Sequence, residues 1–74
     1  MKLPVISGRE AVKALERAGF SVVRQRGSHV RLMKALEDEV IKLTIPLHST
    51  LKKGTLSRIV KDAGLTVEEF VELL

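Results

Sequence analysis

Residues 20–46 read FSVVRQRGSHVRLMKALEDEVIKLTIP, and this stretch decides the fold. It contains three runs of β-forming residues separated by two turn sequences: 20–26, Gly27-Ser28, 29–34, Glu37-Asp38-Glu39 and 40–46. Pro46 ends the third run, because proline has no amide hydrogen to donate to a strand ladder. The pattern predicts an antiparallel meander that is covered on one side only.

Alternation along the second and third runs predicts which side chains share a face of this sheet. The aliphatic positions fall on one side: Val30, Leu32, Ile41, Leu43 and Ile45. If that side faces a core, the opposite side is open, polar and cationic. It then carries His29, Arg31, Lys42 and Thr44.

A first helix is predicted before the strands. Ser7-Gly-Arg-Glu10 fits a capping box, in which the serine hydroxyl and the glutamate carboxylate satisfy each other's backbone amides. Apolar residues recur at helical spacing after it, and Gly19 suits the left-handed residue that follows a helix. The pattern predicts a helix over about residues 8–18.

Two further helices are predicted after the strands. The first has Thr55 as its N-cap and Gly64 at its end. Thr66-Val-Glu-Glu69 is a second capping box, and the short helix that it opens has an apolar side formed by Val67, Phe70, Val71 and Leu74. The element order is therefore αβββα plus a terminal helix, which is an α+β fold. No composition shift divides residues 1–74, so we expect a single domain.

Length and composition limit the classes of protein to consider. A domain of 74 residues buries only about 60% of the surface that its unfolded chain exposes, so its core must be thin. The absence of cysteine excludes a disulfide framework and a thiolate zinc site. No apolar run approaches the roughly 20 residues that span a bilayer, and no signal-peptide segment is evident. We therefore expect a cytoplasmic protein that does not associate with membranes.

The net charge of +4 is unevenly distributed. Residues 1–34 carry eight Lys or Arg and two Glu, a balance of +6, whereas residues 63–74 carry three Glu and no Lys or Arg, a balance of −3. A polyanion is attracted to the first half of the chain and repelled by its tail. The chain has no Tyr or Trp on which bases would stack, so nucleic-acid binding is expected to depend on backbone charge and shape.

His29 is the best catalytic candidate. It follows the Gly27-Ser28 turn, and histidine is the side chain whose ordinary pKa suits both proton donation and proton acceptance near neutral pH. Four basic residues lie within five positions of it: Arg24, Arg26, Arg31 and Lys34. Fixed positive charge around a proton-transfer group suits phosphodiester cleavage, in which negative charge builds on the phosphoryl oxygens. RNA is therefore the first substrate to consider.

Three other groups of residues each allow two interpretations. His48 is either a catalytic partner of His29 or a residue that shapes its own loop. Lys52-Lys53-Gly54-Thr55 precedes a predicted helix and either contacts a phosphate or forms a solvated loop. Glu68, Glu69 and Glu72 resemble a metal cluster but fit the solvated side of an amphipathic helix better. With two histidines far apart in the sequence, we expect neither a metal ion nor a cofactor.

The chain resembles the HicA-type toxins of bacterial and archaeal toxin–antitoxin systems, also called YcfA-like mRNA interferases. The matching stretches cover nearly the whole chain and occur in the family's order: Ser7-Gly-Arg-Glu10, Leu15-Glu-Arg-Ala-Gly-Phe20, Gly27-Ser28-His29, Ile45-Pro-Leu-His48 and Leu51-Lys-Lys-Gly-Thr-Leu56. The resemblance implies a double-stranded-RNA-binding-domain-like fold and metal-independent cleavage of mRNA. It also implies that His29 is the catalytic residue and that a HicB-type antitoxin silences the toxin.

We therefore expect an endoribonuclease in which the RNA 2′-hydroxyl attacks the neighbouring phosphorus while His29 moves protons. Further residues are expected to bind the RNA or stabilise its developing charge: Arg24, Arg26, Ser28, Arg31, Lys42, Lys52 and Lys53. His48 is a secondary candidate. The alternatives are a non-catalytic RNA-binding module that grips A-form RNA by its shape, and an interaction subunit whose basic face docks an acidic partner.

Overall fold

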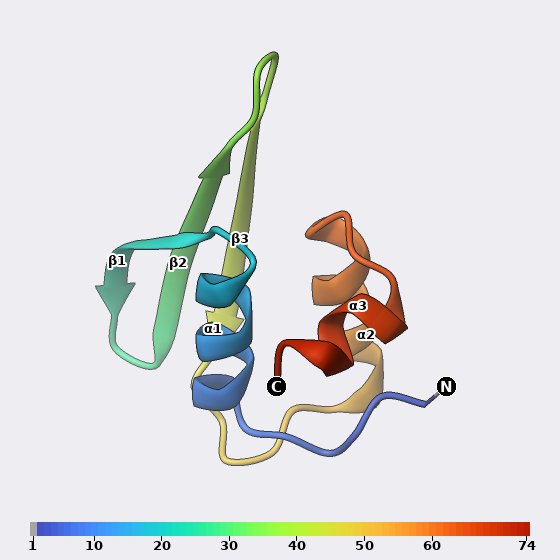
Figure 1. Cartoon of the computed structure of the whole chain (residues 1–74). Helices are drawn as coiled ribbons and strands as arrows, with labels where there is room; N and C mark the ends of the chain where they lie inside the picture. The colour runs from blue at the N-terminus through green and yellow to red at the C-terminus, as the bar shows by residue number, and fades with distance from the viewer. Residues whose placement is uncertain (1) are drawn as a thin grey trace.

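Three antiparallel strands form one sheet in the order β1-β2-β3, and three helices accompany it. The structure is a computed structural model, and it describes residues 2–74. Its elements are α1 (Gly8–Arg17), β1 (Ser21–Arg26), β2 (His29–Ala35), β3 (Val40–Pro46), α2 (Lys53–Asp62) and α3 (Val67–Glu72). Figure 1 shows that this is the predicted α+β fold, αβββα with a further short helix, which matches the double-stranded-RNA-binding-domain-like arrangement.

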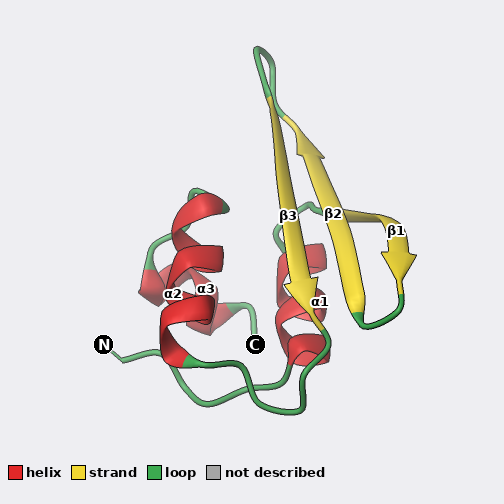
Figure 2. Ribbon diagram, turned by 180° about the vertical axis from the view of Figure 1, so that it is seen from behind, coloured by secondary structure: helices red, strands yellow, loops and turns green. Residues whose placement is uncertain are grey.

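The helices cover one face of the sheet and leave the other open. Figure 2 looks onto the open face, with α1 behind the strands and α2 and α3 beside β3. Five fully buried side chains, from α1, β2, β3, α2 and α3, define the core between these layers: Leu15, Leu32, Ile45, Leu56 and Phe70. The predicted aliphatic face is confirmed, because Val30, Leu32, Leu43 and Ile45 are buried and Ile41 is half-buried against them.

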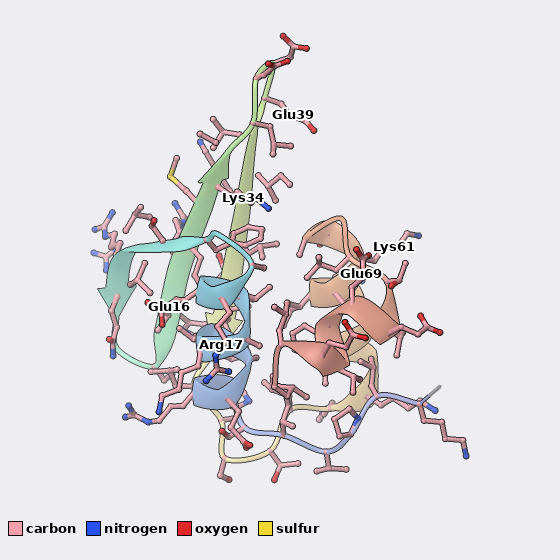
Figure 3. All side chains as sticks on the ribbon, viewed as in Figure 1. Glu16, Arg17, Lys34, Glu39, Lys61 and Glu69 are labelled. Atoms are coloured by element: carbon pink, nitrogen blue, oxygen red, sulfur yellow. The ribbon has the colours of Figure 1, made fainter. Side chains whose placement is uncertain are left out.

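Strands β2 and β3 pair without interruption from His29 opposite Pro46 to Ala35 opposite Val40. Their hairpin extends beyond the helices and ends in the predicted polar turn, where the Leu36 amide donates to the Glu39 carbonyl at 2.8 Å (Figures 1 and 3). The β1–β2 turn contains Gly27 at φ +59°, a left-handed conformation that favours glycine. The same turn is tied to the loop after β3, because the Leu47 amide donates to the Ser28 carbonyl at 2.6 Å.

Strand β1 contains a β-bulge. Val22 lies opposite Leu32, but Arg24 lies opposite Arg31, so Val23 is one extra residue on β1. An extra residue reverses the alternation of the side chains that follow it. Every residue of β1 is exposed, including Val22 at 44% and Val23 at 50%, because this edge strand extends past the helices that cover β2 and β3.

The helix boundaries agree in part with those predicted from the sequence. Both capping boxes are present: Ser7 with Glu10 and Thr66 with Glu69. The predicted N-cap Thr55 is wrong, because α2 begins at Lys53 with Lys52 as its N-cap, three residues before Thr55, and no side chain caps it. The cause is tertiary. The buried residue Leu51 is anchored by its amide, which donates to the Ile6 carbonyl at 2.8 Å, and the helix starts directly after this anchor.

At the C-terminus, the leucine that packs against the core is one residue earlier than predicted. Helix α3 ends at Glu72, so Leu74 leaves the predicted apolar side and is 44% exposed, while Leu73 packs against the core in its place. The Arg17 guanidinium donates to the Leu73 carbonyl at 2.6 Å and fastens this end to α1 (Figure 3). In residues 2–74 there is no helix with the length and apolar character that a bilayer crossing requires.

Gly8 joins the start of α1 to the end of β3. Its amide donates to the His48 carbonyl at 2.9 Å. A methyl group added to its Cα would collide with the Pro46 carbonyl oxygen and would lie 2.9 Å from the Leu47 Cα. At the other end of α1, the Lys34 ammonium donates to the carbonyl of the C-cap residue Ala18 at 2.8 Å (Figure 3). These two contacts hold α1 against both ends of the sheet.

Candidate active site

The open face of the sheet carries a hollow of about 260 Å³ near the β1–β2 turn. Five residues line it, and we call it the arginine hollow: Arg24, Arg26, His29, Arg31 and Thr44. Strand pairing explains the grouping. Arg26 on β1 is opposite His29 on β2. Arg31 on β2 lies between Arg24 on β1 and Thr44 on β3 and pairs with both. One residue pair from each of β1 and β2 and one residue from β3 therefore meet on a single surface.

The bulge at Val23 brings the two β1 arginines into the hollow. Val22 lies opposite the buried Leu32 and therefore belongs to the covered face. In a regular strand, Arg24 and Arg26 would share that face with Val22, because side chains alternate with a period of two. The extra residue moves both guanidiniums to the open face, opposite Arg31 and His29.

The hollow concentrates positive charge. Arg24 and Arg31 are direct cross-strand neighbours, and like charges in that position destabilise a sheet by a few tenths of a kcal/mol to about 1 kcal/mol. No carboxylate lies among the lining residues. Arginine offers five N–H donors in a planar fork that matches phosphate oxygens. The arrangement therefore favours an anion with several acceptor oxygens.

His29 stands at the edge of the hollow as the first residue of β2. Its side chain is exposed, while its backbone position is held on both sides, by Arg26 on β1 and by Pro46 on β3. A histidine here can exchange protons with a ligand whose anionic groups contact the arginines. The lining contains one imidazole, one hydroxyl and three guanidiniums, which is a poor donor set for a divalent metal ion.

The other sequence-predicted residues lie outside the arginine hollow. Lys42 is exposed on the open face but is opposite Met33, further along the hairpin. Ser28 is exposed in the turn before His29, and its carbonyl accepts from Leu47. His48, Lys52 and Lys53 are exposed, and they occupy the loop after β3 and the start of α2. In the part of the chain from residue 2 to 74, no three His, Asp or Glu residues gather where they would hold a metal ion.

Thr44 is the residue in the hollow to which sequence reasoning gave no role. Alternation along β3 predicted that it lies on the open face with Arg31 and Lys42, but only the charged residues of that face were assigned a role in RNA binding. Its register opposite Arg31 puts it in the lining, and this register depends on tertiary pairing of β2 with β3. The alternation of β3 indicated its face from the sequence, whereas its position opposite Arg31 required the structure.

Comparison with known proteins identifies the family. The family model for the HicA toxin of bacterial toxin–antitoxin systems matches residues 8–65 of this sequence, a range that includes α1, all three strands and α2. A search of curated protein sequences gave no match. Because the family match spans well over half of the 74 residues and contains the whole arginine hollow, the chain belongs to the HicA toxin family.

Proposed function

We propose that this toxin is an endoribonuclease that cleaves mRNA without a metal ion, with His29 as its catalytic residue. The observation that carries the proposal is the arginine hollow, where a single histidine lies beside three guanidiniums and no carboxylate. The family match supports a toxin, and the chemistry of the hollow supports a phosphodiester as its substrate.

The reaction follows from the groups in the hollow. The 2′-oxygen of a ribose forms a bond to the adjacent phosphorus while the bond from phosphorus to the 5′-oxygen breaks. A proton leaves the 2′-oxygen and a proton reaches the 5′-oxygen, so the products are a 2′,3′-cyclic phosphate and a 5′-hydroxyl, with no further reactant. His29 moves these protons, and Arg24 and Arg31 stabilise the charge on the phosphoryl oxygens.

Residues around the hollow extend the RNA contact. Arg26 lies opposite His29 within the hollow, whereas Lys42, Lys52 and Lys53 are exposed outside it and contribute positive charge along the path of the strand. These contacts are to phosphates and carry little base specificity.

The partner is a HicB-type antitoxin, since the family is defined within toxin–antitoxin systems. The antitoxin silences the toxin by covering the arginine hollow. Acidic groups suit this role, because residues 1–34 carry a balance of +6 and the hollow contains no carboxylate of its own.

The test compares the two histidines. His29→Ala is expected to lower the cleavage rate of labelled RNA by about 10²- to 10⁴-fold, which is the usual contribution of general acid–base catalysis. His48→Ala is the matched control, because His48 is also exposed but lies outside the hollow, and it is expected to cleave at nearly the parent rate. Both variants should keep their thermal stability and RNA affinity, because neither side chain is buried.

A parent protein that binds RNA and leaves it intact would instead favour the non-catalytic RNA-binding module. His29→Ala cleaving at the parent rate would remove His29 from the mechanism.

A further inference from the structure

The side chains of the arginine hollow supply three kinds of hydrogen-bonding group. The three guanidiniums only donate, and they prefer anionic oxygens. His29 is needed for proton transfer in the proposed function. The remaining polar group is the Thr44 hydroxyl, which is neutral and can both donate and accept. It is therefore suited to a neutral hydroxyl on the ligand.

The register places Thr44 close to the proposed chemistry. Thr44 is opposite Arg31, and Pro46, two residues on, is opposite His29, so Thr44 and His29 are diagonal neighbours on the same face. Such neighbours lie about 7–8 Å apart on adjacent strands. A ribose and its phosphate can therefore contact both residues at the same time.

The size and lining of the hollow are compatible with the same assignment. Sites for drug-sized ligands measure roughly 300–1,000 Å³. The arginine hollow, at about 260 Å³, lies on an open face and has room for a sugar–phosphate unit. Its lining offers guanidiniums for the phosphate oxygens and one hydroxyl for the ribose, but no aromatic side chain on which a base would stack.

We infer that Thr44 is a specificity-determining residue whose hydroxyl hydrogen-bonds the 2′-hydroxyl of the ribose bound in the arginine hollow, and that it thereby distinguishes RNA from DNA. The 2′-hydroxyl is the group by which a protein tells the two nucleic acids apart at a given site. This inference rests on the proposed function, since it assumes that the hollow receives RNA. It assigns a separate task to Thr44: the arginines hold the phosphate, and Thr44 holds the sugar.

The experiment measures binding, so that it does not depend on cleavage. A His29→Ala background keeps the strand intact, and the probes are an RNA oligonucleotide and the fully 2′-deoxy strand of the same sequence, at one salt concentration. Into this background we place Thr44→Val, which has the shape of threonine without its hydroxyl, and Thr44→Ser, which restores the hydroxyl. Thr50→Val is the matched control, because Thr50 is an exposed threonine in the loop after β3 and is absent from the hollow's lining.

Thr44→Val is expected to weaken RNA binding about 3- to 10-fold, the value of one hydrogen bond, and to leave binding of the deoxy strand unchanged. Thr44→Ser should recover most of the RNA preference, and Thr50→Val should behave as the background does. The inference fails if Thr44→Val weakens both strands equally, if it weakens neither, or if the background itself binds both strands equally. Failure of the proposed function appears separately, as intact RNA after incubation with the parent protein.

Discussion

Gly8→Ala should destabilise this protein, although alanine is normally the better helix residue. In an open helical position the change from glycine to alanine stabilises by up to about 1 kcal/mol. At Gly8 the new methyl group would collide with the Pro46 carbonyl oxygen and would lie 2.9 Å from the Leu47 Cα. Both are backbone atoms, so the clash is relieved only if the end of β3 moves away from α1.

The size of the effect follows from that geometry. Overpacking of a tight contact costs about 1–3 kcal/mol, and movement of the segment also weakens the hydrogen bond from the Gly8 amide to the His48 carbonyl. We expect a net loss of about 1–3 kcal/mol in the free energy of unfolding. For a domain of this size each kcal/mol lowers Tm by about 4–8 °C.

Gly54→Ala is the matched control. Gly54 also lies in the first turn of its helix, but a methyl group there would meet nothing within 4 Å. Urea denaturation followed by circular dichroism should show a lower midpoint for Gly8→Ala and an unchanged or higher midpoint for Gly54→Ala, with equal m-values. Equal midpoints for the two variants would refute the argument that α1 is packed directly on the β3 backbone.

Three further predictions concern the RNA chemistry. Cleavage should continue in excess EDTA, because the arginine hollow offers no carboxylate to a divalent ion, and activity that disappears and returns with added magnesium would contradict this. Replacing the ribose 5′ to the cleaved phosphate with deoxyribose should stop cleavage there, and normal RNA should yield a 2′,3′-cyclic phosphate or its hydrolysed monophosphate; an upstream fragment with a free 3′-hydroxyl would argue for another nucleophile. Association with the antitoxin should slow as salt rises and should reduce the solvent exposure of His29, whereas a complex in which His29 stays exposed points to an allosteric block.

Local signals in the sequence predicted most of the secondary structure. Each of the two capping boxes lies within four residues, and the alternation of β2 and β3 continues without a break. Both could therefore be predicted without tertiary information. The start of α2 could not be predicted in this way. It depends on the anchoring of Leu51 to Ile6, two residues that are 45 positions apart, and Thr55 merely has the chemistry of a cap.

The site was predictable as a set of residue types but not as a surface. The run from Arg24 to Arg31 indicated cationic groups near His29, yet alternation alone does not say which face Arg24 and Arg26 occupy. Their side depends on the bulge at Val23, and a pair of adjacent valines gives no local indication of where a strand will gain a residue. The exclusion of Lys52, Lys53 and His48 from the hollow likewise depends on the path of the loop after β3.

That extra valine also makes strand register, rather than residue type, the property that determines the character of each face. If β1 were regular, with Val23 itself opposite Arg31, every side chain from Arg24 to the turn would change sides: the guanidiniums would point toward α1, and Gln25 would lie opposite His29. Composition, net charge and hydropathy would be identical in the two registers. Deletion of Val23 would instead remove the bulge and leave Arg24 opposite Arg31, so both β1 arginines would stay in the arginine hollow.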